Sequence, residues 1–281
     1  MSEPDTKTVV ADAFHAASAE YEQVGPEFFA LFGRTLVEKA MVEPGMRVLD
    51  VGCGTGAALL PAAEAVGNTG RVLGIDLAAG MVERVEQAIA ERGWTHAEAK
   101  QGDAEDPPAD PAGWDRILAA QVLFFLPDPA QAVTQYHRRL KPGGVLAFSS
   151  WGPDNPDWAP VHRALFSHIP EGSMPKLTPS GGTFKSDDTI SELLESAGFA
   201  SIEHETITYD IVYDDPEQWL RWSRSHGAIA FWDAIPADEL ETARNEATAV
   251  LESMRTADGT LHMVIPVRYT VAMRPSPTLP H

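Results

Sequence analysis

The sequence contains one cysteine, Cys53, among its 281 residues. A single cysteine permits neither an internal disulfide nor a cysteine metal cluster, and we expect no metal site. Basic residues are also scarce, because 21 lysines and arginines stand against 41 aspartates and glutamates, a formal net charge of −20. Such a surface repels phosphate backbones and anionic lipid headgroups, so we expect neither a nucleic acid nor a membrane as partner.

Long apolar runs are missing as well. The longest, residues 117–126, contains Gln121 and is far shorter than the roughly 18 residues of a membrane helix. Residues 1–12 are polar and acidic, without the basic-then-apolar pattern of a signal peptide. We therefore expect a cytoplasmic protein, and its apolar fraction of 44% is ordinary for a soluble globular chain.

One stretch stands out as a ligand cradle. Residues 48–51 predict a short buried strand, Gly52, Gly54 and Gly56 a turn, and residues 57–65 a helix. Glycines allow positive φ angles and a close approach of the backbone to a ligand. The helix N-terminus offers unpaired N–H groups and partial positive charge, so a polar or negatively charged ligand group is expected there.

Strands and helices alternate along the chain, which favours an α/β fold with a parallel sheet and right-handed crossovers. The predicted strands cover residues 48–51, 71–75, 96–101, 117–123, 145–149, 202–212 and 261–273. The predicted helices cover residues 5–19, 26–43, 57–65, 81–92, 129–140 and 187–197, a segment from Pro216, and residues 236–256. Residues 151–185 are rich in proline and glycine and are expected to form an irregular, lid-like connection.

Three carboxylates, Asp50, Asp76 and Asp103, fall at or beside the carboxyl ends of successive predicted strands. In an open parallel sheet those ends face the ligand crevice. Asp76 can accept hydrogen bonds from vicinal ribose hydroxyls, and Asp103 from an exocyclic amine such as that of adenine. The alternative for Asp76 is a purely structural cap of the helix that follows.

The run Leu-Asp-Val-Gly-Cys-Gly-Thr-Gly at residues 49–56 resembles the first motif of the class I S-adenosylmethionine-dependent methyltransferases. Asp103-Ala104 and Lys-Pro-Gly-Gly at residues 141–144 also fit, and the chain is similar to the ubiquinone/menaquinone-biosynthesis type of small-molecule methyltransferase over about residues 20–150. The resemblance implies a Rossmann-like, mostly parallel seven-stranded sheet flanked by helices, with N-terminal helices and a C-terminal helical lid insertion.

We expect a single methyltransferase domain over residues 1–281. Its expected parts are N-terminal helices (1–43), a cofactor-binding core (44–150), a substrate-specific part with the last strands (151–274) and a tail (275–281).

The resemblance also implies the residues around the cofactor. S-adenosylmethionine is expected to contact Tyr21, Asp50, Gly52, Cys53, Gly54, Gly56, Asp76, Leu77, Met81, Asp103, Ala104 and Gln121. The glycine run takes the methionine moiety, and Cys53 itself is interpreted as a small packing residue. Asp76 takes the ribose, Leu77 and Asp103 the adenine, and Gln121 the methionine end. Asp50 either orients the turn or receives the ammonium group.

The implied reaction is direct displacement of a methyl group onto an O, N or C acceptor. Positioning alone can lower such a barrier by ~7–11 kcal/mol, and a general base adds typically ~10²–10⁴-fold. His226, in the turn Ser225-His226-Gly227, is the candidate base, with His15 and Tyr21 as further candidates. The alternative for His226 is an exposed or hydrogen-bonded structural histidine.

Aromatic residues in the C-terminal half predict the acceptor. Trp219 and Trp222 lie three positions apart on one predicted helix and share a face. We expect this face to roof a pocket with Phe124 and Phe125 opposite and Trp151 at the rim, holding a hydrophobic or aromatic small molecule. The alternative is that the face packs on the sheet as core.

Two other functions stay open at this point. Gly52, Gly54 and Ala57 satisfy G-x-G-x-x-A, which permits an NAD(P)-dependent oxidoreductase. Against it stand the Asp103-Ala104 pair and the lack of an obvious Tyr-x-x-x-Lys pair. A non-catalytic S-adenosylmethionine-binding protein is the third possibility. The acceptor molecule, the pathway and the oligomeric state are not readable from the residues.

Overall fold

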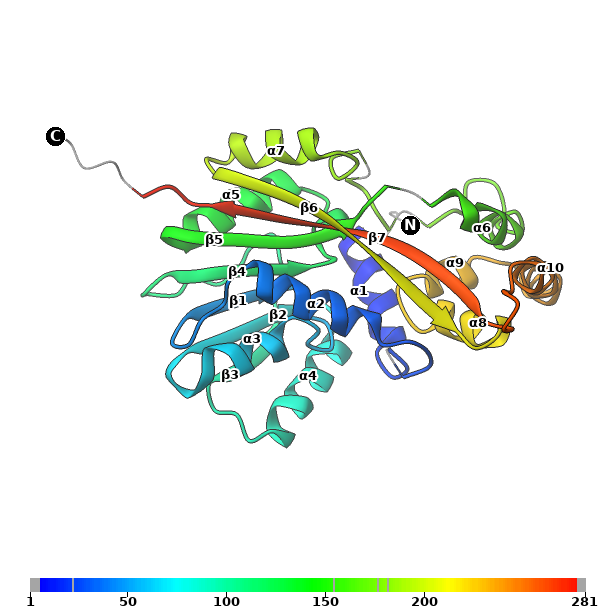
Figure 1. Cartoon of the computed structure of the whole chain (residues 1–281), viewed down its shortest axis with the longest axis horizontal. Helices are drawn as coiled ribbons and strands as arrows, with labels where there is room; N and C mark the ends of the chain where they lie inside the picture. The colour runs from blue at the N-terminus through cyan, green and yellow to red at the C-terminus, as the bar shows by residue number, and fades with distance from the viewer. Residues whose placement is uncertain (1–5, 22, 154, 176, 181, 277–281) are drawn as a thin grey trace. The chain divides into compact units, whose positions relative to one another are not determined.

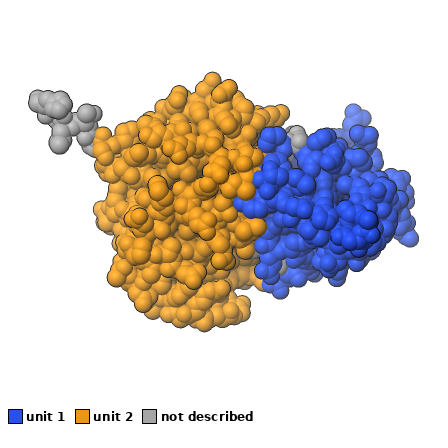
Figure 2. All heavy atoms as spheres, viewed as in Figure 1, with its two compact units in different colours: residues 1–28, 153–177, 208–266 blue, residues 29–152, 178–207, 267–281 orange. Residues whose placement is uncertain are grey.

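The structure is a computed structural model that describes residues 6–21, 23–153, 155–175, 177–180 and 182–276. The chain divides into two compact units, each assembled from three separate segments (Figure 2). Unit 1 comprises Met1–Phe28, Pro153–Leu177 and Thr208–Pro266, and unit 2 comprises Phe29–Gly152, Thr178–Ile207 and Val267–His281. Residues 277–281 of the predicted tail, and residue 5 of the first predicted helix, lie outside the described residues.

A seven-stranded sheet in the order β3-β2-β1-β4-β5-β7-β6 organises the fold (Figure 1). The strands are β1 (Arg47–Val51), β2 (Arg71–Asp76), β3 (Ala97–Gln101), β4 (Trp114–Ala120), β5 (Leu140–Trp151), β6 (Ala200–Tyr213) and β7 (Leu261–Met273). The pairs among β1 to β5 are parallel, and β7 runs antiparallel to β5. The mostly parallel seven-stranded sheet confirms the predicted Rossmann-like architecture.

The strand order reverses at β1, which lies between β2 and β4. Chain order runs from β1 outward to β3 and then returns to β4 on the other side. In α/β sheets, ligands bind at such a switch point, beyond the carboxyl ends of the strands. Asp50 on β1 stands opposite Gly74 on β2 and Leu118 on β4, directly at this point.

The helices of unit 2 flank the sheet (Figure 1). They are α2 (Phe28–Lys39), α3 (Leu59–Val66), α4 (Ala79–Glu91), α5 (Pro129–Arg139) and α7 (Asp187–Ser196), with short 3-10 turns at Gly67–Thr69 and Leu123–Phe125. Apolar side chains of β1, β2, β4 and β5 form one core with Val133 and Tyr136 of α5 and Ile190 and Leu194 of α7. Asp128 caps α5, because its Oδ1 accepts a 2.9 Å bond from the Gln131 N–H.

Unit 1 is mainly helical. It contains α1 (Thr6–Ala17), α6 (Ala159–Phe166), α8 (Pro216–Arg224), α9 (Ile229–Asp233), α10 (Leu240–Ser253) and a 3-10 turn at Pro156–Trp158. Helix α10 packs against α6 and α8, and α1 against α9. Helix α8 begins at Pro216 as predicted, and Asp215 caps it by accepting a 2.7 Å bond from the Gln218 N–H. No helix in the described part of the chain is both long and apolar enough to cross a membrane.

Two predicted strand boundaries are wrong, one of them beside the ligand crevice. Strand β4 ends at Ala120 rather than Leu123, because Gln121 adopts a positive φ of 59° and its N–H turns to the carbonyl oxygen of Ser149. Strand β5 is longer than residues 145–149, since it already begins at Leu140 and the Lys-Pro-Gly-Gly run lies within it.

The helices also depart from the predicted pattern. Helix α2 begins at Phe28, so Pro26 precedes it rather than forming its first turn, and α10 begins at Leu240 rather than Pro236. The segment 151–185, predicted as irregular, contains α6. The 3-10 turn Pro156–Trp158 leads into α6, and the side chain of Asn155 before that turn accepts a 3.0 Å bond from the Asp157 N–H.

Candidate active site

The three glycines of the turn after β1 have different surroundings. Gly52, Gly54 and Gly56 all have positive φ angles, 64°, 52° and 102°. A Cβ added to Gly52 would lie 2.5 Å from Val122, and one added to Gly56 would lie 2.8 Å from Val85. A Cβ on Gly54 would meet no atom of the described residues within 4 Å. Gly52 and Gly56 therefore permit packing of the turn, while Gly54 presents its backbone to open space.

Cys53 also fixes the turn, through its contacts with β2. The N–H of Cys53 donates a 2.9 Å bond to the carbonyl oxygen of Ile75 on β2. Its side chain is 4% exposed and lies against Gly74, where an added Cβ would come within 2.8 Å of Sγ. Burial raises the pKa of the Cys53 thiol, so it stays protonated. Cys53 can therefore contact a cofactor through its backbone while its side chain packs on β2.

Sequence reasoning missed Gly33 of α2. A Cβ at this position would lie 2.1 Å from the carbonyl oxygen of Ala57, so the helix touches the backbone of the turn directly. Only glycine allows this approach, since 2.1 Å is far inside van der Waals contact. The available signal was a lone glycine inside a predicted helix, which indicates a packing reason.

Asp76 links the end of β2 to the glycine turn. Its Oδ2 accepts a 2.9 Å bond from the Gly54 N–H, and its Oδ1 accepts a 2.9 Å bond from the Ala78 N–H at the start of α4. Burial raises the pKa of the Asp76 carboxyl, and these N–H groups oppose the rise. A carboxylate has about four lone-pair sites, so Asp76 can hold the turn that precedes α4 and still accept bonds from ribose hydroxyls.

Asp50 is a buried carboxyl group without a compensating partner. Its side chain is 1% exposed, and neither oxygen accepts a hydrogen bond from any described residue. Burial, and then the nearby Asp76, raise its pKa well above the usual range; the Leu59 N–H opposes this but lies outside hydrogen-bond geometry. A buried ionised carboxylate is costly unless paired. A ligand with a cationic group, such as the ammonium of S-adenosylmethionine, would supply the missing partner.

Gln121 is the second unsatisfied polar side chain at the switch point. It follows β4, and its side-chain Nε2 and Oε1 are both buried without a hydrogen-bond partner in the described ranges. Its backbone N–H is held 3.1 Å from Oγ of Ser149 on β5. The ends of β1 and β4 therefore each present one unpaired polar group, and a polar ligand placed there would satisfy both.

Asp103 and Ala104 lie after β3, as predicted. Oδ1 of Asp103 accepts a 2.9 Å bond from the Glu105 N–H, which fixes the loop locally. The carbonyl oxygen of Ala104 accepts a 2.8 Å bond from the buried Tyr136 hydroxyl of α5. The loop that would hold the adenine is therefore anchored to the core.

Leu77 and Met81 follow β2. The carbonyl oxygen of Leu77 accepts a 2.8 Å bond from Nε2 of Gln101, the last residue of β3. Met81 lies on α4 and is only 1% exposed. Leu77 is therefore positioned beside the end of β3, while Met81 offers a cofactor almost no accessible surface.

The aromatic residues predicted for the acceptor pocket fall into both units. In unit 2, Phe124 lies 4.5 Å from Phe125 and 6.3 Å from Trp151, between ring centroids. Trp151 is 40% exposed. These three residues are brought together, beyond the end of β4 and at the end of β5.

In unit 1, Trp222 is the centre of an aromatic cluster. Its ring centroid lies 4.0 Å from His226, 5.5 Å from Tyr213 and 6.4 Å from Trp219. Trp219 in turn stacks on Trp158 at 5.5 Å. The predicted Trp219, Trp222 and His226 are thus neighbours, whereas the contributions of Tyr213 and Trp158 were missed because they come from other segments. We call these five residues the Trp222 cluster.

His226 is half-buried against Trp222. Its Nδ1–H donates a 2.8 Å bond to the carbonyl oxygen of Trp222, which leaves Nε2 as the proton-accepting nitrogen. Burial lowers the pKa of His226 to about 4, so the imidazole is neutral near pH 7. Tyr21, also in unit 1, has its ring 6.3 Å from Phe14.

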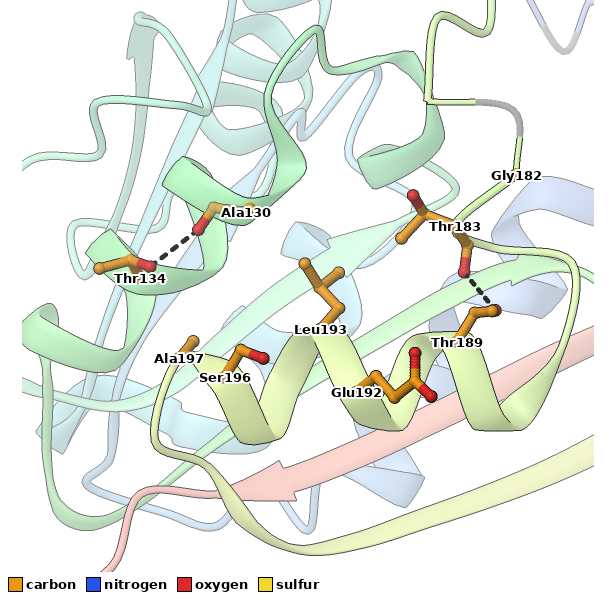
Figure 3. Close-up of a pocket in the computed structure, with 9 residues that line it drawn as sticks. All are labelled: Ala130, Thr134, Gly182, Thr183, Thr189, Glu192, Leu193, Ser196 and Ala197. Atoms are coloured by element: carbon orange, nitrogen blue, oxygen red, sulfur yellow. Dashed lines mark hydrogen bonds between the residues drawn. The ribbon is translucent and has the colours of Figure 1, made fainter.

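A groove of about 620 Å³ lies between α5 and α7 in unit 2 (Figure 3). Its lining is formed by Ala130, Thr134, Gly182, Thr183, Thr189, Glu192, Leu193, Ser196 and Ala197. Two of the threonine hydroxyls are already bonded at 2.8 Å, to the carbonyl oxygens of Ala130 and Thr183. This lining contains none of the predicted site residues, and we assign it no part in the active site.

The sequence of the chain resembles those of known methyltransferases. The pattern of a family described as "Methyltransferase domain" matches residues 48–144. Aklanonic acid methyltransferase DauC from Streptomyces sp. (strain C5) is 34% identical over 218 residues, 73% of this chain and 98% of that protein. The chain belongs to the class I S-adenosylmethionine-dependent methyltransferases.

Other proteins resemble this one along most of its length. Nocamycin O-methyltransferase from Saccharothrix syringae is 29% identical over 277 residues, 94% of this chain and 98% of that protein. The solved structure of the YcgJ protein from Bacillus subtilis shares the fold, with a TM-score of 0.59 at 16% identity, over 88% of this chain and 99% of that one. The predicted family, enzyme class and cofactor S-adenosylmethionine are confirmed, and the oxidoreductase alternative is not favoured.

Proposed function

We propose that this methyltransferase methylates an aromatic or hydrophobic small molecule bound by the Trp222 cluster. The observation that carries the proposal is the grouping of Trp219, Trp222 and His226 in unit 1. Aromatic walls with few polar groups are typical of sites for apolar ligands. The charge of −20 supports a small molecule over a nucleic acid, and the cytoplasm is the proposed location.

Unit 2 is proposed to hold the cofactor, which supplies a methyl group activated by a sulfonium. Gly54 would offer its backbone, and Asp76 the carboxylate for the ribose. Asp50 would pair with the ammonium, and Gln121 would complete the hydrogen bonds at the methionine end. Leu77 and the Asp103-Ala104 loop would border the adenine. The support is the open side of Gly54 and the unpaired atoms of Asp50 and Gln121.

Oxygen is the acceptor atom that we propose among O, N and C. The relative that spans 94% of this chain is named an O-methyltransferase. The low pKa of His226, about 4, makes it a weak base, and a weak base is useful only when the acceptor hydroxyl is itself acidic. We therefore favour an enol or an acyl-substituted phenol, whose proton His226 would accept at Nε2.

The test combines cofactor binding with methyl transfer. Native mass spectrometry of the purified protein identifies any co-purified acceptor, and radiolabelled methyl transfer to a panel of enols and acylphenols measures activity. Trp222→Ala is expected to reduce methyl transfer at least about tenfold while S-adenosylhomocysteine affinity, measured by calorimetry, stays unchanged. The matched control is Trp232→Phe, since Trp232 is buried in the same unit with its Nε1 bonded to Ser223 at 3.0 Å. Loss of both binding and transfer in Trp222→Ala would show that the cluster is core.

A further inference from the structure

Two hydrogen-bond donors of the Trp222 cluster are buried without a partner. Tyr213 is fully buried and Trp219 is 3% exposed. Neither the Tyr213 hydroxyl nor the Trp219 Nε1–H bonds to any residue that the structure describes. Buried donors are almost always satisfied in folded proteins, so each exception needs an explanation.

The two donors flank the same ring. Trp222 lies 5.5 Å from Tyr213 and 6.4 Å from Trp219, between centroids, and they approach from different elements: Tyr213 ends β6, and Trp219 lies on α8. Trp158 stacks on the far ring of the pair, Trp219, and holds it in place. The two rings that carry the donors therefore both lie near Trp222, the one tryptophan of the cluster that is only half-buried.

Comparable buried donors elsewhere are satisfied. The hydroxyl of Tyr136, also fully buried, donates a 2.8 Å bond to the carbonyl oxygen of Ala104. Nε1 of Trp232, on α9 in the same unit as Trp219, donates a 3.0 Å bond to Oγ of Ser223. The fold therefore does supply partners for buried tyrosine and tryptophan donors. For the two donors of the Trp222 cluster, no partner is found among the described residues.

We propose that the Tyr213 hydroxyl and the Trp219 Nε1–H donate hydrogen bonds to a neutral carbonyl oxygen of the aromatic acceptor. This deepens the proposed function and rests on it. Both groups are neutral donors, and a buried charge would be costly beside them, which favours a ketone, ester or quinone carbonyl over a carboxylate or phosphate. Burial raises the pKa of Tyr213, so its hydroxyl keeps the proton that it donates. A carbonyl conjugated to the acceptor hydroxyl would also acidify that hydroxyl, as the weak base His226 requires.

The test uses two probes of the same shape, 2-acetonaphthone and 2-ethylnaphthalene, with the full-length protein. The wild type is expected to bind the ketone at least about fivefold more tightly, and Tyr213→Phe is expected to lose most of that preference. In a spectrum of the indole N–H groups, the ketone is expected to shift the Trp219 signal and leave the Trp232 signal in place. The hydrocarbon is expected to shift neither. Trp219→Phe assigns the first signal and Trp232→Phe the second.

Stability provides the matched control. Removing an unpaired hydroxyl is expected to leave the melting temperature of Tyr213→Phe unchanged or higher, whereas Tyr136→Phe, which loses a bond, melts lower. Equal binding of both probes, or binding of neither, would overturn the inference. A Tyr213→Phe variant that melts lower and still prefers the ketone would also overturn it, because the hydroxyl would then be bonded to an ordered water. Calorimetry with S-adenosylhomocysteine separates the failures. Absent cofactor binding refutes the proposed function, while intact cofactor binding without a ketone preference refutes the carbonyl site alone.

Discussion

The backbone N–H of Gly54 donates a 2.9 Å hydrogen bond to Oδ2 of Asp76. This bond joins the turn after β1 to the end of β2, so the glycine turn and the carboxylate proposed to bind the ribose are directly connected. A substitution at Asp76 would therefore remove both the proposed ligand contact and the acceptor that holds the turn.

Asp76→Ala is expected to weaken S-adenosylhomocysteine binding by at least roughly tenfold. Hydrogen bonds to a charged group contribute ~1.5–3 kcal/mol each, and 1.4 kcal/mol is about one decade. Isothermal calorimetry measures the affinity. Asp76→Asn keeps one acceptor oxygen and should fall between the wild type and the alanine variant. An unchanged dissociation constant would mean that Asp76 only holds the turn before α4, and tight binding of NAD or NADP would contradict the cofactor assignment.

Asp50 predicts that cofactor affinity depends on pH. Its pKa is raised by burial and by Asp76, and an ammonium group binds the ionised carboxylate. Affinity for S-adenosylhomocysteine should therefore fall about tenfold per pH unit below the raised pKa, and level off above it. Calorimetry in buffers of different ionisation enthalpy should detect proton release on binding. Asp50→Asn should bind more weakly and show no such slope; a wild-type affinity independent of pH would refute the pairing.

The ionised form of Asp50 should also lower the stability of the folded protein. Because the folded-state pKa of Asp50 lies above its unfolded value, its stabilising contribution is complete below the unfolded pKa of about 3.9 and is lost as pH rises through the raised folded value. Asp50→Asn removes this titration. Urea unfolding is therefore expected to show the variant gaining on the wild type as pH rises through that window. A constant difference between the two proteins would contradict the assignment.

His168 predicts a second loss of stability with rising pH, in unit 1. Its Nδ1 and Nε2 lie 3.0 Å from carboxylates of Glu239 and Glu246, and these carboxylates raise its pKa. The stabilisation is present below the unfolded pKa of about 6.5 and is lost as pH rises through the higher folded value. Thermal unfolding should therefore lose stability across that window in the wild type. His168→Gln and the double variant Glu239→Gln/Glu246→Gln should lack the slope.

Gly33→Ala tests whether α2 positions the turn. The added methyl would lie 2.1 Å from the carbonyl oxygen of Ala57, so either the helix or the turn must move. We expect a loss of about 1–3 kcal/mol in unfolding free energy and weaker S-adenosylhomocysteine binding. Gly182→Ala is the matched control, because its added Cβ would meet no described atom within 4 Å. Wild-type affinity in Gly33→Ala would show that the turn tolerates the shift.

Local rules made much of this site predictable. Strand ends in a parallel sheet meet at one edge, so Asp50, Asp76 and Asp103 could be grouped from sequence alone. Capping chemistry fixed the starts of two helices at Asp128 and Asp215, because each cap depends only on residues three positions away.

The rest depended on contacts between distant segments. Gly33 matters because of Ala57, and Tyr213 because of Trp222, and neither pair leaves a periodic signal in the sequence. The end of β4 was misplaced because apolar residues continue to Leu126, while the left-handed backbone of Gln121 stops the strand. Hydrophobic periodicity records burial and not the dihedral angle that ends a strand.

The pairing of β5 with β7 bears on how the enzyme is made. Val145–Trp151 pairs with Val267–Met273, so the partner of an apolar central strand is the last strand of the chain. During translation, β1 to β5 can assemble from contiguous sequence, but the β5 edge has no partner until β7 leaves the ribosome. Open apolar edges recruit strands from other chains. Chains interrupted before Leu261 are therefore expected to aggregate, and whether the nascent protein stays monodisperse depends on the synthesis of β7.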